Sequence, residues 1–190
     1  MMADYTVIAD VGASLLKLLR EQMTPEPIRQ PELIGLASPA DKGDLSLSLF
    51  LYNIKENGDH RQTHMIKRGQ DSIQFPPMTI DLSYLLIPHS TAELQVRALD
   101  EHRILGRAMQ VIYDNAILRG SFLQGSLAEN NEEVRIVMDN IPAETLTRMW
   151  NFADNPYKLA VSYTVGPVTI DSNRIKTTKP VLERDIRIQG

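Results

Sequence analysis

Residues 78–120, MTIDLSYLLIPHSTAELQVRALDEHRILGRAMQVIYDNAILRG, decide the fold. The first part alternates its side chains between two faces, as a strand does, because successive strand side chains point in opposite directions. One face carries large apolar side chains: Met78, Ile80, Leu82, Tyr84 and Leu86. Leu85 and Ile87 lie on the other face, and Pro88 cannot donate to a strand ladder. We therefore expect a central strand that ends at Pro88.

The second part of this stretch predicts a long amphipathic helix. Its apolar residues recur at helical spacing with polar residues between them: Ile104, Leu105, Ala108, Val111, Ile112 and Ile117. Gly106 is expected on the inner side of the helix, where the missing side chain would let another backbone come close. Arg119-Gly120 is typical of a helix C-terminus. Strand and helix form the largest apolar unit in the sequence, and this unit predicts a fold but no reaction.

The composition limits the class of protein. A chain of 190 residues is expected to form one domain without staples, and the absence of cysteine excludes disulfides and thiolate chemistry. A net charge of -4 argues against a nucleic-acid partner, because general binders of polyanions carry a basic face. No apolar run approaches the roughly 20 residues that span a bilayer, and no signal peptide begins the chain. We expect a soluble protein made in the cytoplasm, with no membrane partner.

Three elements are predicted before the central strand. Asp4 or Thr6 is placed to cap a first helix, which Thr24 and the prolines after it close. The apolar stripe of this helix comprises Val7, Ile8, Val11, Leu15, Leu18 and Leu19. Residues 33–37 are expected to form a short edge strand, and residues 45–57 a long one. The polar run 58–77 predicts a long exposed connection.

The chain after the central helix predicts shorter elements. Residues 122–127 suggest a short extended piece, and residues 129–133 a solvated turn. Val134, Ile136 and Met138 alternate as a strand does, and Pro142 opens a short helix. A strand is expected over residues 158–170, broken at Gly166-Pro167. We predict an α+β fold in which a mixed or antiparallel sheet packs against the N-terminal and central helices. Residues 1–170 would form the domain, and residues 171–190 an extended arm.

The four histidines are the candidate metal ligands of the sequence. His60 and His64 are four residues apart, which would place both on one face of a helix, but they lie in the expected loop. His89 and His102 belong to no metal-binding motif. We therefore predict no metal site and no cofactor. The competing hypothesis is a small metal-dependent hydrolase that uses these histidines with Asp81 or Asp100.

Other candidate sites have structural interpretations. Asp100, Glu101, His102 and Arg103 resemble a catalytic cluster, but the first turn of a helix favours carboxylates. Arg61, Lys67 and Arg68 form a small basic loop without interleaved aromatic residues. Trp150, together with Met149 and Phe152, suits either an interface anchor or the core. The chain also lacks a phosphate-binding glycine loop, a GxSxG elbow and an HExxH motif, so we predict no catalytic residues.

Several segments together carry a resemblance to a known family. They are YTVIADVGASLLKLLRE, LSLFLYNIKEN, PPMTIDLSYLLIPHS, EHRILGRAMQVIYDN and YKLAVSYTVGPVTIDS, which cover nearly the whole chain. In this combination the chain resembles the tail-terminator, or cap, proteins of phage-tail-like contractile injection systems of the antifeeding-prophage and virulence-cassette type. Some members carry a further C-terminal region, which we expect to be absent here.

The resemblance implies a structural subunit and no enzymatic activity. Such a subunit would form a homohexameric ring at the end of the particle distal from the baseplate, where it contacts the inner tube protein and the sheath protein. Its fold would be similar to that of phage tail-terminator proteins. Assembly would take place in the cytoplasm, within a particle that can be released from the cell. A tube-to-baseplate adaptor of the same particle is the alternative, because it would share the fold class.

Overall fold

The computed structural model describes residues 5–69, 71–150 and 157–177. Its helices, including two short 3-10 helices (η), are α1 (Val7–Met23), η1 (Pro31–Leu33), α2 (Leu94–Asp114), η2 (Gly120–Phe122), α3 (Gly125–Glu129) and α4 (Ala143–Trp150). Its strands are β1 (Ile34–Leu36), β2 (Leu47–Glu56), β3 (Ile66–Lys67), β4 (Ser72–Gln74), β5 (Met78–Pro88), β6 (Ile117–Leu118), β7 (Val134–Asp139), β8 (Val161–Ile170) and β9 (Ile175–Thr177). The predicted α+β class is confirmed.

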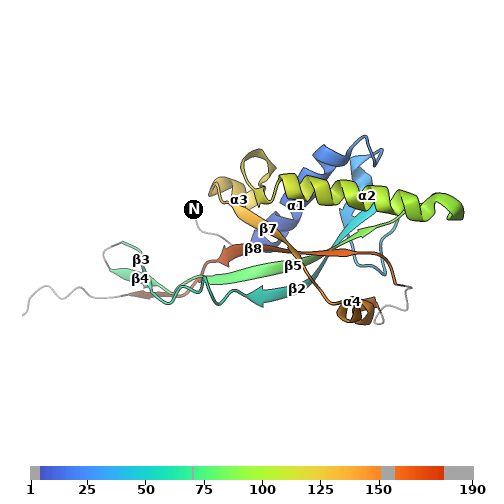
Figure 1. The fold of residues 1–190 in the computed structure, drawn as a ribbon. Coiled ribbons are helices and arrows are strands. Elements are labelled where there is room, and N and C mark those ends of the chain that lie inside the picture. The colour runs from blue at the N-terminus through green and yellow to red at the C-terminus, as the bar shows by residue number, and fades with distance from the viewer. Residues whose placement is uncertain (1–4, 70, 151–156, 178–190) are drawn as a thin grey trace, which may run out of the picture.

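The strands form two sheets. The main sheet has six strands in the order β1-β2-β5-β8-β7-β6, so the predicted central strand β5 lies inside it. Among the strand pairs of the described residues, only β1–β2 is parallel. The smaller sheet, β3-β4-β9, projects from one end of the molecule (Figure 1). The backbone bond from Phe75 N to Arg174 O, at 3.0 Å, continues the β5–β8 ladder into the β4–β9 pair.

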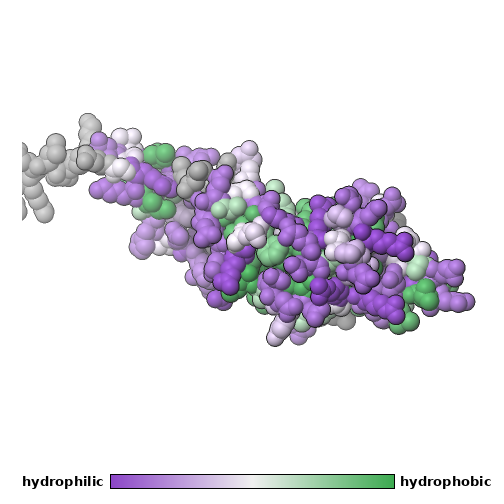
Figure 2. Space-filling model, turned by 90° about the horizontal axis from the view of Figure 1, so that it is seen from above, coloured by the Kyte–Doolittle hydropathy of each residue, from purple (hydrophilic) through white to green (hydrophobic). Residues whose placement is uncertain are grey.

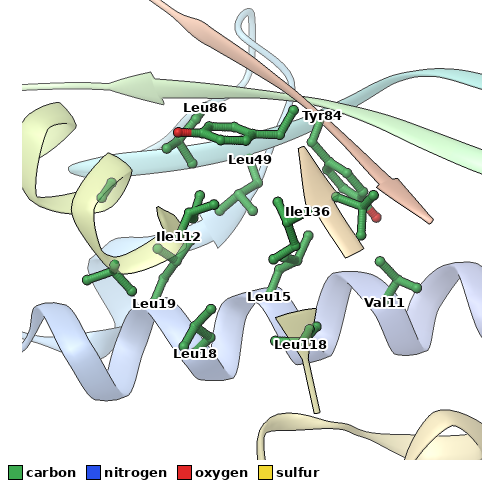
Figure 3. Close-up of a cluster of buried hydrophobic side chains, with 14 of the residues drawn as sticks. Val11, Leu15, Leu18, Leu19, Leu49, Tyr84, Leu86, Ile112, Leu118 and Ile136 are labelled. Atoms are coloured by element: carbon green, nitrogen blue, oxygen red, sulfur yellow. The ribbon is translucent and has the colours of Figure 1, made fainter. Parts of the chain in front are cut away.

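The helices cover the main sheet unequally. α1, α2 and α3 lie on one face, and the short α4 lies on the other (Figure 1). Leu15 and Leu19 of α1 point towards Leu49, Tyr84 and other side chains of the sheet (Figure 3). The buried apolar residues of α1 are Val7, Val11, Leu15, Leu18, Leu19 and Met23. Burial of these side chains stabilises the fold by roughly 1.5 to 3 kcal/mol each. The main core therefore lies between α1, α2 and the sheet.

The N-terminal helix begins as its sequence predicts. Thr6 is the N-cap residue of α1, although its hydroxyl bonds the Asp10 side chain at 3.2 Å rather than a backbone N–H. Asp4, the other predicted cap, lies outside the described residues. Asp10 also accepts hydrogen bonds from Ser126 N at 3.0 Å and Ser126 Oγ at 2.6 Å. These bonds fix α3 to α1 across the sequence.

Two predictions about the central helix are wrong. Gly106 is exposed, and a Cβ built on it meets no atom within 4 Å, so the residue mediates no close backbone approach. Helical spacing alone assigned it to the inner face, but the buried stripe passes through Leu105 and Ala108 instead. Ile117 lies beyond the helix, in β6, and is 42% exposed. α2 ends at Asp114, so the helical periodicity does not extend to Ile117.

Three connections also differ from the prediction. The run 58–77 is not a simple loop: it contains β3 and β4, which pair with each other, and β4 also pairs with β9. Residues 122–127 turn into η2 and α3 instead of an extended piece; Gly125 has φ +55 and lies against Asp10, where a side chain would clash. Gly166-Pro167 does not break β8. The register shift between Ile80 and Leu82 forms an irregularity there, which accommodates a residue without an N–H.

Candidate interaction surface

The predicted metal ligands are not brought together. His60 Nδ1 lies 3.1 Å from Asn57 Oδ1, and the Asn57 amide in turn donates to both Asp81 oxygens, at 3.0 and 2.8 Å. Asp81 therefore anchors the turn that follows β2. His64 is exposed in the segment before β3. Within the described residues, no three His, Asp or Glu side chains are arranged to hold a metal ion.

Replacing His60 and His64 together with alanine is expected to leave the fold unchanged. Both side chains are exposed, and Asn57 Oδ1 keeps its bond from the His60 backbone N–H, at 3.0 Å. Surface changes of this kind alter the free energy of unfolding by about 0.5 kcal/mol or less. Chemical denaturation of the double variant tests this. Asn57→Ala is the control that should be destabilised, because it removes the hydrogen-bond partner of Asp81. Loss of a bound metal from the double variant, together with unfolding, would contradict the structural interpretation.

The acidic pair on α2 holds a loop in place. Asp100 accepts a bond from Ser90 Oγ at 2.5 Å, and Glu101 accepts one from Ser90 N at 3.3 Å. The prediction that these carboxylates occupy the first helical turn is wrong, because α2 begins at Leu94. The helical periodicity of the sequence did not show that α2 begins before Asp100. The pair fastens the end of β5 to the helix instead, and His102 is exposed beside it.

A buried polar network at the end of β5 was not predicted. His89 Nε2 lies 2.9 Å from Ser48 Oγ, and Lys158 Nζ lies 3.2 Å from His89 Nδ1. Because the lysine ammonium can only donate, Nδ1 accepts and Nε2–H donates to the serine. Burial, together with the positive charges of Lys158 and Lys42, lowers the pKa of His89 to about 4. Ser48 is 0% and His89 2% exposed, so this pair joins strands and is closed to a substrate.

The neutral His89 predicts a specific pH dependence of stability. An unfolded histidine has a pKa near 6.5, so between that value and about 4 the unfolded chain binds the extra proton. Stability is therefore expected to fall as the pH drops below about 6.5, by up to about 1.4 kcal/mol per pH unit from this residue. Urea denaturation at several pH values across this interval measures the slope. His89→Gln is expected to give a flatter profile, and equal slopes would contradict a buried neutral histidine.

The basic loop and the tryptophan cluster have structural partners. Arg61 Nε lies 3.5 Å from Glu56 Oε1, and Arg68 Nε donates to Gln74 at 2.6 Å. Trp150 is 3% exposed and packs with Leu85 and other residues beneath α4, so of its two suggested roles the structure shows the core one. Phe152 and the side chain of Met149 lie outside the described residues.

Among the described residues, no helix is both long and apolar enough to cross a membrane.

Exposed apolar side chains lie on α2, at strand edges and on the projecting sheet. Figure 2 shows apolar groups among the polar surface both on that sheet and near the middle of the molecule. Met65 and Ile175 are 46% and 60% exposed there. At the β1 edge, an open groove of about 540 Å³ is lined by Tyr5, Thr6, Ile8, Ala9, Leu36, Ala37, Ser38, Leu49, Phe50, Leu51 and Tyr84. These features suit contacts with other polypeptides better than the binding of a small substrate.

Comparison with solved structures identifies the same architecture in two proteins. One is the sheath/tube terminator of PVC, an extracellular contractile injection system, in its extended state; it has a TM-score of 0.67 at 18% identity over 96% of this chain. The other is the tube-terminating cap of the anti-feeding prophage, with a TM-score of 0.60 at 19% identity over 95% of this chain. The chain spans 63% and 61% of those two proteins, just under two thirds of their length. These likenesses show the fold.

The sequence itself matches a family model. The model describes the Pvc16 N-terminal domain and matches residues 10–184. No curated protein shows a significant match. The matched range begins within α1 and extends beyond β9, so it includes both sheets and every helix from α2 to α4. The predicted family is confirmed: the chain belongs to the Pvc16 N-terminal domain family.

Proposed function

We propose that this protein is a structural subunit that caps and terminates the tube and sheath of a contractile injection system. Membership of the Pvc16 N-terminal domain family over residues 10–184 is the observation that carries the proposal. The fold supports it, since the two similar structures are a sheath/tube terminator and a tube-terminating cap. The roles of those two proteins imply the inner tube protein and the sheath protein as partners of this chain.

The subunits would form a homohexameric ring at the end distal from the baseplate, assembled in the cytoplasm as part of a particle that is later released. Free strand edges and exposed apolar side chains on the projecting sheet support contacts between subunits. The role requires no chemistry, and the candidate residues Asp81, His89 and Asp100 each serve a structural hydrogen bond instead. We therefore propose a protein without enzymatic activity.

The length of assembled tubes tests this function. Particles would be produced from cells that lack this protein and from the same cells supplied with it on a plasmid. Without the protein, the tubes are expected to be uneven in length, because nothing stops their growth at a defined point. Electron microscopy of negatively stained particles gives the two length distributions. Tubes of uniform length, with intact sheaths, in the deletion strain would refute the terminating role.

A further inference from the structure

One long strand has an unpaired backbone edge. β1 pairs with β2 only over Leu47–Leu49, and the last backbone bond on that side runs from Ala37 N to Leu49 O at 3.1 Å. β2 continues to Glu56, bonded to β5 on its other side. Within the described residues, no backbone hydrogen bond reaches the outer side of β2 beyond Leu49. We call residues 50–56 the free edge.

The register identifies which backbone groups the free edge offers. Asn57 N donates to Thr79 O at 2.9 Å, so this pair is hydrogen-bonded within the β2–β5 ladder. Along an antiparallel ladder, hydrogen-bonded pairs alternate with non-hydrogen-bonded pairs. Ile54 and Glu56 therefore belong to non-hydrogen-bonded pairs with β5, and their N–H and C=O groups point outward. Before the irregularity in β2, His89 N donates to Ser46 O, so this pair is also hydrogen-bonded between the two strands. The same alternation therefore turns the N–H and C=O of Leu51 outward. An added strand could therefore bond the edge without disturbing β5.

Apolar surface lies beside the free edge. Ile54 pairs with Leu82 of the main core, so its side chain lies on the face that the long helices cover, and it is 46% exposed. The groove of about 540 Å³ adjoins it and includes Leu36, which is 50% exposed. On the opposite face, Lys55 is exposed and forms no ion pair within the described part of the chain. The edge thus offers apolar contacts on one face and a positive charge on the other.

We propose that residues 179–190 of a second copy of this chain add to the free edge as an antiparallel strand. The segment reads KPVLERDIRIQG and alternates apolar Ile186 and Ile188 with charged residues. Placing Ile186 opposite Ile54 puts Asp185 opposite Lys55, and it directs Ile188 towards the groove. The parallel alternative with the same apolar pair would instead set Arg187 against Lys55, which is unfavourable. This inference rests on the ring assembly proposed above and names the contact that closes it.

The geometry of the chain favours a second copy over the same copy. Thr177 pairs with Ser72 at the far end of the projecting sheet, whereas Glu56 pairs with Ile80. Lys55 pairs with Asp81, which lies about 30 Å from Ser72 along the ribbon, and a strand added to β2 lies three strand spacings from β9, about 14 Å across, so the straight-line distance is about 33 Å. The chain from Thr177 to Asp185 spans at most about 29 Å when fully extended. The chain's own arm therefore falls short of its own free edge.

Such a contact is head-to-tail. Each copy would lend its segment at the tip of the projecting sheet and receive one at β2, so the donor and acceptor surfaces differ. Contacts of this kind close into a ring when the rotation per subunit matches the symmetry, and otherwise form open filaments. Main-chain hydrogen bonds supply the affinity in strand addition, while alternate side chains select the register. The proposed pairing therefore predicts one defined register.

Disulfide trapping tests the pairing directly, because the natural chain has no cysteine. Full-length Lys55→Cys and Asp185→Cys variants, carrying tags of different size, are purified separately, mixed and mildly oxidised. The two positions form a non-hydrogen-bonded pair in the proposed register, with Cα atoms about 4.5 Å apart, which a disulfide can span. Val137→Cys on β7 is the matched control partner for Asp185→Cys, because Val137 is a strand residue at the other side of the sheet and is 57% exposed.

We expect at least about tenfold more mixed dimer with Lys55→Cys than with Val137→Cys, because pairing raises the effective concentration of the thiols. Adding Ile54→Pro to Lys55→Cys should abolish the excess, since proline removes an outward N–H and spares the β5 bonds. Thermal unfolding checks that this variant folds. Mixed dimer at the level of the Val137 control would overturn the inference. Light scattering on the same mixture distinguishes failure of the strand pairing from failure of the proposed function. A ring mass without the disulfide leaves the proposed function standing, and monomers alone contradict both the pairing and the function.

Discussion

Replacing Leu105 with alanine is expected to lower the free energy of unfolding by about 2 to 5 kcal/mol. Leu105 is 4% exposed on α2 and belongs to the main core, so the change removes buried methyl groups and leaves a cavity. Leu49→Ala should act similarly, because Leu49 is 2% exposed on β2 and lies opposite α1 in the same core (Figure 3). Urea denaturation gives the free energies, and an unchanged m-value would show that the compactness of both states is preserved.

Leu94 provides the matched control on the same helix. Its side chain is 80% exposed, so Leu94→Ala removes the same atoms without creating a cavity. We expect its effect to lie within about 0.5 kcal/mol. If Leu105→Ala and Leu94→Ala denature at the same urea concentration as the parent protein, the helix does not pack on the sheet through the face described above.

Deleting residues 179–190 is expected to abolish the ring while the subunit stays folded. Every buried apolar residue of the described structure lies at or before Val168, so the deletion leaves the core intact. The helical circular dichroism should therefore remain nearly unchanged. The ring is lost because each copy can no longer lend a strand to the free edge of the next. Light scattering reports the change from a ring mass to a monomer mass.

The control for this deletion keeps the residues and removes the pattern. Residues 179–190 are replaced by the same amino acids in an order that destroys the alternation of Ile186 and Ile188. Length and composition are then constant, so loss of the ring in both variants traces the effect to the paired strand. Rings of normal mass from the truncated protein would show that the arm is dispensable and that other surfaces hold the subunits together.

Local patterns in the sequence predicted the central elements of the fold. The alternation around Leu82 and the helical spacing around Leu105 were sufficient, because burial of one face dominates the energetics of long elements. The same periodicity misplaced Gly106, since a glycine adds no hydrophobic signal that could place it on either face. The short strands β3 and β4 were missed because two and three residues are too few to show an alternating pattern, and because β4 pairs with β9, which lies far away in the sequence.

The features that bear on interactions needed three-dimensional information. The sequence did suggest an arm at residues 171–190, but the free edge of β2 follows from where β1 stops, which no local pattern reveals. Asp10 gives no sign in the sequence that it binds Ser126. His89 likewise resembles a surface histidine until Ser48 and Lys158 enclose it. These contacts join residues far apart in the chain, and only the assembled fold brings them together.

A reconstruction of the intact particle by electron microscopy tests the central claim most directly. The structure described here would be placed into the density, with a tag on this chain to confirm its position. The proposal predicts a closed ring of this subunit at the end distal from the baseplate, in contact with the last tube and sheath rings. Density for the subunit between the tube and the baseplate, or none in the assembled particle, would contradict it.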